Sequence, residues 1–219
     1  MPRVSKVQTA ANHSAIEAAA SRLFRARGLG GVSVSELMAE AGLTHGAFYA
    51  HYPSKNALAA AACAAAFAAA DTAWRQRAAT AANPAAARQA IAADYLRDAN
   101  RDPAVAACPT ATLAGDVARE ADTHPIHAVY VDGVRRQIDV LAAFGTSGDA
   151  GQDRADACLA LATMMGALLI ARATHGDAVA DEVLAAARHR LASPEANQKK
   201  RRSARKLPAP RRRSPGGAR

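Results

Sequence analysis

Residues 33–55, SVSELMAEAGLTHGAFYAHYPSK, decide the fold of this chain. Ser33 and Glu36 have capping-box spacing, in which each side chain accepts a hydrogen bond from the backbone N–H of the other at a helix start. Gly42 stands where a helix often ends in the left-handed conformation that glycine adopts readily. Thr44 can cap a second short helix, and the proline and serine after it open a third. The stretch predicts two short helices joined by a tight turn.

The second of these helices has an inner and an outer face. The side chains expected to pack inward are Leu43, Ala47, Phe48 and Tyr52. The residues left on the outer face are His45, Gly46, Tyr49 and His51. Two short helices joined in this way are typical of the helix-turn-helix, whose second helix enters the major groove of DNA. The alternative is an ordinary helical hairpin with a glycine corner.

Residues 16–58 resemble the N-terminal domain of the TetR-type (tetracycline-repressor-like) transcriptional regulators. The matching residues are Ile16, Ala19, Leu23, Phe24, Gly28, Val34, Ala41, Gly42, Gly46, Phe48, Tyr49, His51, Tyr52, Ser54, Lys55 and Leu58. The resemblance implies an all-α fold, with a three-helix DNA-binding domain followed by a helical domain that binds an effector and forms a homodimer.

The resemblance also implies roles at the DNA. It implies that Thr44, His45 and Gly46 contact base edges. It also implies that Tyr49, His51 and Lys55 contact phosphates. Gly46 lets the backbone approach the groove, and Lys55 lies at a helix N-terminus, which favours anions. Each assignment has an alternative: Tyr49 could be a surface aromatic and His51 a helix-ending cap. Ser33 could be only a cap, or could also reach a phosphate.

Composition and charge agree with a helical DNA-binding protein. Half of the residues are hydrophobic, and these are mostly alanine, which favours helix. The formal net charge is +9, with ten Lys or Arg and no acid in residues 198–219, and six basic and three acidic residues in 1–56. Residues 57–197 carry twelve basic and sixteen acidic residues. Positive ends around a mildly acidic middle suit a DNA-facing module on a domain that does not touch DNA.

We expect four segments: a flexible arm over 1–12, a helix-turn-helix DNA-binding domain over 13–56, a helical effector-binding and dimerisation domain over 57–192, and a disordered basic tail over 193–219. The tail is either a solvated end or a source of sequence-independent DNA affinity. The helices expected outside the motif cover about 12–27, 55–79, 84–98, 109–120, 125–144, 153–175 and 177–192.

The cysteines and the apolar runs predict a cytoplasmic protein. The chain has three cysteines, an odd number, and they are widely spaced at Cys63, Cys108 and Cys158. This pattern does not suggest a disulfide framework. The uncharged runs 57–70 and 157–171 fall short of the roughly 20 apolar residues that a membrane span needs.

The helix over 153–175 is apolar on two faces, so one face could pack within the chain and the other on a second subunit. In the resembled family, the last two helices form the dimer interface. The interface candidates are Leu159, Thr163, Gly166, Ile170, Val183 and Ala187. A central core helix of a monomer is the alternative.

The effector site is expected within the helical domain. Its candidates are Trp74, Tyr95, Cys108, Thr112, Asp116, Tyr130, Gln137 and Met165, each of which could be plain core instead. Cys108 precedes a proline at an expected helix N-terminus, where the macrodipole stabilises a thiolate. His124 and His127 have no evident third partner, so we expect a helix start and no metal site.

Together these features predict a homodimeric repressor, without a cofactor or enzymatic activity, that a small-molecule or thiol-reactive effector releases from a double-stranded DNA operator. Two alternatives remain. One is a nucleoid-type protein that binds DNA without sequence preference. The other is a helical enzyme with Cys108 as nucleophile, although no positioned base is visible.

Overall fold

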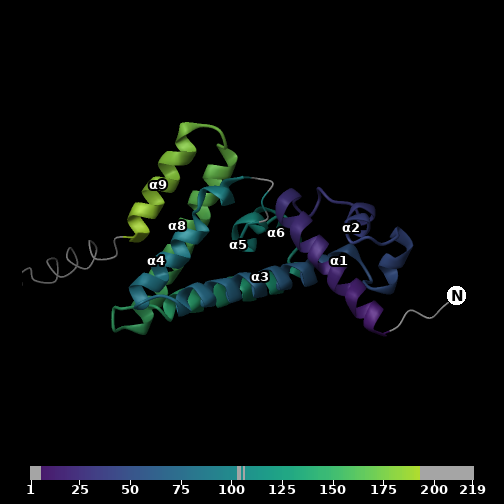
Figure 1. Ribbon diagram of the computed structural model, residues 1–219, viewed down its shortest axis with the longest axis horizontal. Coiled ribbons are helices and arrows are strands. Elements are labelled where there is room, and N and C mark those ends of the chain that lie inside the picture. Colours follow the sequence, from purple (N-terminus) through teal and green to yellow (C-terminus); the bar gives the residue numbers. More distant parts are fainter. Residues whose placement is uncertain (1–5, 103–104, 106, 193–219) are drawn as a thin grey trace, which may run out of the picture.

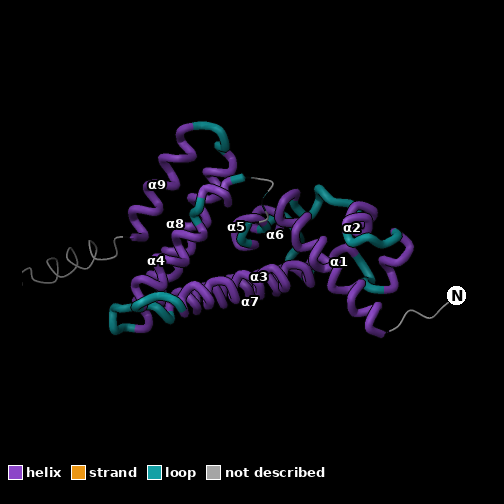
Figure 2. The backbone as a smooth tube through the Cα atoms, viewed as in Figure 1, coloured by secondary structure: helices purple, strands orange, loops and turns teal. Residues whose placement is uncertain are grey.

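The computed structural model describes residues 6–102, 105 and 107–192, and within these ranges it contains helices and no strand (Figure 2). The first four are α1 (Lys6–Arg27), α2 (Val34–Glu40), the 3₁₀ helix η1 (His45–Ala50) and α3 (Lys55–Ala79). The next four are α4 (Pro84–Tyr95), the 3₁₀ helix η2 (Asp98–Arg101), α5 (Pro109–Thr112) and α6 (Ala114–Val117). The last three are α7 (Ile126–Ala142), α8 (Ala150–Ala173) and α9 (Ala178–Ala192). The predicted all-α fold class is confirmed.

Side-chain caps fix several of these helix starts. The Ser54 hydroxyl accepts a hydrogen bond from the Ala57 N–H at 3.1 Å at the start of α3. The Asn83 side chain accepts one from the Ala86 N–H at 2.9 Å, and proline fills the first position of α4. Because these caps are local in sequence, the starts of α3 and α4 lie where the sequence predicts them.

Two helix starts differ from the expectation. Helix α1 begins at Lys6, so the prediction of an arm over 1–12 is wrong from residue 6 onward. Residues 1–5 and the predicted tail lie outside the described residues. Helix α8 begins at Ala150 because Asp149 caps it, accepting from the Gly151 N–H at 2.8 Å, so the preceding loop is shorter than expected.

The single helix expected over 109–120 is instead two four-residue helices, α5 and α6, that meet at Leu113. Ala111 of α5 is buried in a core with Trp74 and Leu161, whereas Leu113 and Val117 are buried in another core with Phe24 and Phe48. The break therefore falls where the chain passes from the first of these cores to the second.

The helices form a head and a body (Figure 1). We call residues 6–56, with α1, α2 and η1, the head, and residues 57–192 the body. Helix α3 starts at the head and runs to the far end of the body, with α7 packed along it. Helices α4, α8 and α9 pack together at the other end from the head, and α5 and α6 lie between the two parts.

Two hydrophobic cores meet along α3. The head core contains Phe24 and Phe48, and it also takes in Leu58, Leu113, Val117 and Ile126 from the body. The body core contains Trp74, Ile91, Leu141, Leu161 and Met164, among others. The body therefore completes the hydrophobic core of the head.

Within the described residues, α3 and α8 are long and apolar enough to cross a membrane by length and composition alone. Both helices also bury a face in the cores of the fold. Core helices of soluble proteins pass the same test, so the two helices do not indicate a membrane protein.

Candidate functional site

Helix α2 begins with the predicted capping box. The Glu36 N–H donates to the Ser33 hydroxyl at 3.2 Å, and the Ser33 N–H and hydroxyl donate to the Glu36 carboxylate at 2.8 and 2.7 Å. Arg27 donates to the same carboxylate at 2.8 Å. The hydrogen bonds from Ser33 first, and then from Arg27, lower the pKa of Glu36 to about 2.

The turn after α2 also has its predicted form. Gly42 has a φ of 71°, in the left-handed region where a side chain would be strained. The Leu43 N–H then donates to the Met38 carbonyl at 2.8 Å and closes the helix end. The turn therefore leads the chain directly into the second element of the motif.

That second element is the six-residue 3₁₀ helix η1, not an α-helix. Thr44 occupies the N-cap position, but its hydroxyl makes no capping hydrogen bond. Phe48 is fully buried and fixes the inner face of η1, whereas Tyr49 is 68% exposed. The Thr44 hydroxyl and the Tyr49 ring are therefore both available at the outer face.

The predicted DNA-binding residues divide by exposure. Five of these residues are exposed: Ser33, Thr44, His45, Gly46 and Tyr49. The other two, His51 and Lys55, are partly buried. Ser33 differs from the rest because its hydroxyl proton is already donated to Glu36. A phosphate contact through this hydroxyl would break the capping box, so the geometry favours the alternative in which Ser33 is only a cap.

Tyr52, just after η1, anchors the motif to α1. Its hydroxyl donates to the Glu17 carboxylate at 2.9 Å, and its ring stacks on His13 with centroids 4.8 Å apart. The His13 ring in turn lies edge-on to His51, with centroids 6.3 Å apart. Burial and the Glu17 carboxylate raise the pKa of Tyr52, so its hydroxyl stays protonated and keeps donating.

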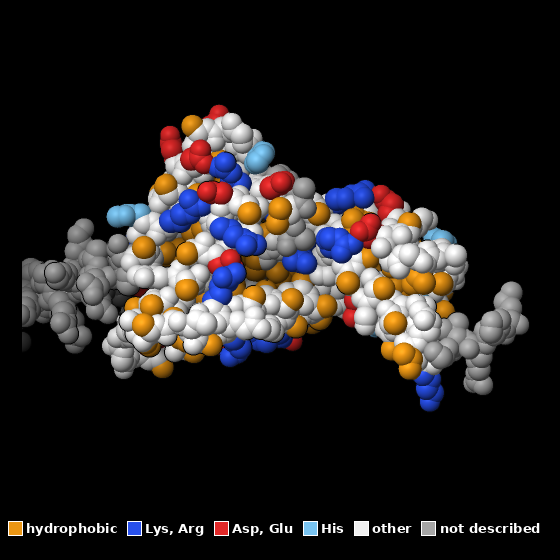
Figure 3. Space-filling view, in the orientation of Figure 1, with side chains coloured by type: hydrophobic (Ala, Val, Ile, Leu, Met, Phe, Trp, Pro, Cys, Tyr) orange, Lys and Arg blue, Asp and Glu red, His pale blue; other side chains and the backbone are white. Residues whose placement is uncertain are grey.

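Most arginines of the head are engaged within the protein. Arg22 pairs with Glu40 and Arg27 with Glu36, and Arg25 donates to the Ala107 carbonyl of the body at 3.1 Å. In the described head this leaves two lysines, Lys6 and Lys55, as cations without an ion-pair partner, although the Lys55 ammonium lies 5.9 Å above the Phe24 ring. Figure 3 shows basic side chains interspersed with acidic ones across this face of the molecule.

In the body, the structure brings four of the predicted effector residues together. The Gln137 amide donates to the Cys108 thiol at 3.2 Å, and the Tyr130 hydroxyl donates to the Thr110 carbonyl at 2.6 Å. The buried Gln137 and Thr110 side chains also share a hydrogen bond. We call Tyr95, Cys108, Thr110, Tyr130 and Gln137 the central cluster.

Tyr95 is the unusual member of the central cluster. Its side chain is buried, and its hydroxyl has no hydrogen-bond partner among the described residues. Burial first, and then the neighbouring Cys108, raise the pKa of Tyr95 well above its ordinary value. Trp74 packs edge-on against the Tyr95 ring, with centroids 6.1 Å apart.

The remaining effector candidates lie elsewhere. The Asp116 carboxylate faces the head, where it accepts a hydrogen bond from the Leu29 N–H at 3.1 Å, and a Cβ on Gly28 would come within 2.8 Å of it. The Thr112 hydroxyl donates to the Cys108 carbonyl at 3.1 Å within its own turn. Met165 packs partly buried on the body core. Asp116 thus joins the head to the body and does not lie in the central cluster.

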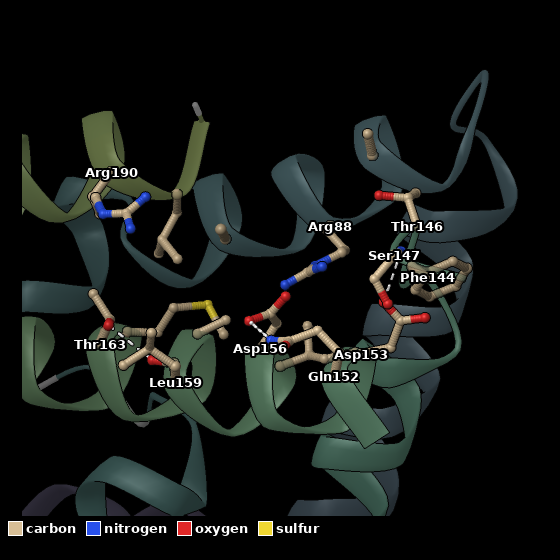
Figure 4. Close-up of a pocket in the computed structure, with 16 residues that line it drawn as sticks. Arg88, Phe144, Thr146, Ser147, Gln152, Asp153, Asp156, Leu159, Thr163 and Arg190 are labelled. Atoms are coloured by element: carbon tan, nitrogen blue, oxygen red, sulfur yellow. Dashed lines mark hydrogen bonds between the residues drawn. The ribbon is translucent and has the colours of Figure 1, made fainter. Parts of the chain in front are cut away.

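A cavity of about 270 Å³ lies between α4, α8, α9 and the connection from α7 to α8 (Figure 4). Its charged lining residues are Arg88, Asp153, Asp156 and Arg190. None of the predicted effector residues lines it. Sequence reasoning missed it because these residues come from separate helices, with no local spacing to connect them.

Helix α8 has an exposed apolar stripe. Leu159 is 60% and Ile170 48% exposed, and Thr163 and Gly166 are partly buried on the same side of the helix. Cys158 is also exposed, about a quarter of a turn away from this stripe. Of the interface residues predicted on the last helix, Val183 is partly buried. Ala187 is buried in the body core, so its prediction as a dimer contact is wrong: α9 turns this alanine toward its own chain.

Residues 16–62 match the family of bacterial regulatory proteins described as the tetR family. No curated protein sequence matches the chain significantly. A TetR transcriptional regulator from Chloroflexus aurantiacus has the same fold, with a TM-score of 0.70 and 25% identity over 85% of this chain and 95% of that one.

Two further solved structures agree. A TetR-family transcriptional regulator from Agrobacterium tumefaciens gives a TM-score of 0.68 at 21% identity, over 83% of this chain and 98% of its own. The structure of the reduced form of E. coli NemR gives a TM-score of 0.67 at 22% identity, over 82% of this chain and 94% of its own. Residues 16–62, which contain the helix-turn-helix of the head, are thus similar to the DNA-binding part of the tetR-family regulators, and the chain shares the fold of TetR-family transcriptional regulators over most of its length.

Proposed function

We propose that the protein is a cytoplasmic homodimeric repressor, without enzymatic activity, and that an effector acting on its body releases it from operator DNA. The observation that carries the proposal is the outer face of η1. There Thr44, His45 and Tyr49 are exposed, and the hydroxyl of Thr44 is not used in capping. A polar face of this kind, backed by a buried Phe48, suits contact with the major groove.

Within this proposal the contacts divide into two kinds. Thr44, His45 and Gly46 read base edges, while Tyr49, His51 and Lys55 bind phosphates. Neutral donors matter here because most head arginines are engaged inside the protein. Phosphate contacts position the head and base contacts choose the sequence.

The dimer would form through the α8 stripe. Leu159 and Ile170 expose apolar surface that a free monomer would leave in water, and the small Gly166 between them allows close approach of a second helix. Two heads held about 34 Å apart, one turn of DNA, could then bind two half-sites. The proposed division is therefore a DNA-binding domain over 13–56 and an effector-binding and dimerisation domain over 57–192.

Release requires that the effector changes the spacing of the heads. Two contacts would carry the change: Asp116 to the Leu29 N–H, and Arg25 to the Ala107 carbonyl. The second contact is one residue from Cys108. An effector that binds or modifies the central cluster would therefore act next to the junction, provided that it favours one arrangement over the other.

A thiol-reactive effector would act at Cys108. Its thiol is partly buried and accepts from Gln137, whereas burial raises the pKa of Cys63 to about 12 and keeps that thiol protonated. The predicted helix dipole contributes little, since α5 has only four residues. NemR, one protein of similar fold, has a structure of its reduced form.

Selection of operators from random DNA with the full chain tests the proposal. Enrichment of a two-fold symmetric sequence supports it, and equal binding to all sequences would favour a nucleoid-type protein instead. Deletion of residues 198–219, which removes ten positive charges, should weaken non-specific binding at low salt and leave the selected sequence preference unchanged. Loss of that preference on truncation would contradict the proposal.

A further inference from the structure

The cavity between α4, α8 and α9 combines an apolar floor with a charged rim (Figure 4). Leu141 and Met164 form part of the floor and are buried in the body core, and Leu191 closes it from α9. At about 270 Å³ the cavity is near the lower end of the roughly 300–1,000 Å³ typical of small-molecule sites. It therefore has room for a small molecule with an apolar body.

Two arginines stand over this floor from different helices. Arg88 comes from the start of α4 and Arg190 from the end of α9, and both point toward the cavity (Figure 4). Within the described part of the chain, neither guanidinium makes a hydrogen bond or a close ion pair, although the pKa of the nearby Asp153 carboxyl is lowered first by hydrogen bonds from Ser147 and to a lesser extent by Arg88. A guanidinium offers several donors in a planar fork that matches a carboxylate, so both remain available to an anion.

The two carboxylates of the lining are already engaged. Asp153 accepts from the backbone N–H of Ser147 at 3.0 Å, which holds the connection between α7 and α8 in place. Asp156 accepts from the Gln152 amide at 2.8 Å. These carboxylates leave the lining without net charge. Because both carboxylates already accept hydrogen bonds and the two guanidinium groups donate none to the described residues, the groups left to bind a ligand are mainly the arginine N–H donors. The cavity therefore favours an anion over a cation.

From this arrangement we propose that the cavity binds a small amphipathic carboxylate. Its carboxylate accepts hydrogen bonds from Arg88 and Arg190, and its aliphatic or aromatic body lies against Leu141, Met164 and Leu191. The start of α4, to which Arg88 belongs, adds the positive end of a helix dipole on the same side.

The position of the cavity gives the ligand a route to regulation, a step that rests on the proposed function. Leu159 and Thr163 line the cavity and also lie along the α8 stripe proposed for the dimer. A ligand touching these residues would shift one subunit against the other and so change the spacing of the heads. The cavity would thus act through the dimer interface, whereas the central cluster lies beside the head.

Calorimetric titration of the full-length protein with octanoate, without DNA, tests the site alone. We expect one octanoate per chain. Arg88→Gln and Arg190→Gln should each weaken binding about tenfold, the usual loss of a charge-assisted hydrogen bond. Arg75→Gln is the matched control, because Arg75 is an exposed arginine of α3 outside the cavity, and it should bind like the wild type.

Octanamide and octylammonium complete the test. Both should bind at least tenfold more weakly than octanoate. Equal binding of octanamide, preferential binding of octylammonium, or unchanged affinity in both arginine variants would overturn the proposal. Ala85→Phe, which fills the cavity from its rim, should abolish binding while thermal unfolding stays cooperative.

A separate titration of operator DNA with octanoate present keeps the two proposals apart. Weaker operator binding in the wild type but not in Arg88→Gln supports both. Arginine-dependent octanoate binding without any change in operator affinity leaves the site standing and refutes its regulatory role. Intact operator binding with no octanoate binding refutes the site and leaves the proposed repressor unaffected.

Discussion

Replacing Lys55 by alanine should reduce the salt dependence of operator binding without changing which operator is preferred. In the described head, Lys6 and Lys55 are the cations engaged by neither an ion pair nor a hydrogen bond. Arg22 and Arg27 are paired, and Arg25 donates to backbone carbonyls. A homodimer presents Lys55 twice, so the variant loses two phosphate contacts. At about 0.9 per contact, the slope of log affinity against log salt becomes shallower by about 1.8. Between 50 and 200 mM salt, the wild type should therefore lose about twelvefold more affinity than the variant.

Fluorescence anisotropy of a labelled operator at several salt concentrations measures this difference. Arg75→Ala removes the same charge from the body and should leave the slope unchanged. Thermal unfolding provides a check, since loss of the contact between Lys55 and the Phe24 ring should cost about 0.5–1 kcal/mol. An unchanged slope together with an altered preference among operators would show that Lys55 reads bases and that the assigned roles are wrong.

Three further predictions concern stability, coupling and reactivity. Because the pKa of Glu36 is lowered to about 2, its carboxylate stabilises the fold above pH 4.5 and loses this effect as the pH falls toward 2. The difference in thermal stability between wild type and Glu36→Gln should shrink over that range, and a constant difference would argue against the capping role. Asp116→Ala should cost about 1.5–3 kcal/mol in denaturant unfolding and weaken effector-induced release; full release would exclude Asp116 from coupling. In thiol labelling of the proposed dimer, Cys108 should react before Cys158, which the second subunit would shield, and Cys63 should react last; fastest labelling of Cys158 would contradict the proposed interface.

Features set by neighbouring residues could be predicted from the sequence. The capping box of Ser33 and Glu36 and the left-handed Gly42 depend on spacings of three residues or fewer and on backbone preference, and both are present in the structure. The buried Phe48 and exposed Tyr49 follow from the same short pattern. The family resemblance then connected these residues to DNA.

Features set by tertiary packing could not be predicted. The helix expected over 109–120 breaks at Leu113, where the chain passes from one core to the other, and the boundary between the cores cannot be read from the local sequence. Nothing in the sequence around Asp116 sets it apart from other polar helix residues. Its hydrogen bond from the Leu29 N–H joins residues 87 positions apart, so no local pattern could reveal it. Arg88 and Arg190 line one cavity only because α4 and α9 pack together.

The sharing of the head core with Leu113, Val117 and Ile126 limits how this protein can be recombined with its relatives. A chimera cut between residues 56 and 57 would give the head a foreign set of side chains where these three belong. Mismatched volumes there would leave voids or clashes beneath the DNA-reading surface. A transplant that keeps this core intact must therefore carry the first half of α3 and the segment around residues 113–126 together with the head. The unit of exchange is discontinuous in sequence, although the residues proposed to contact DNA all lie within the first quarter or so of the chain.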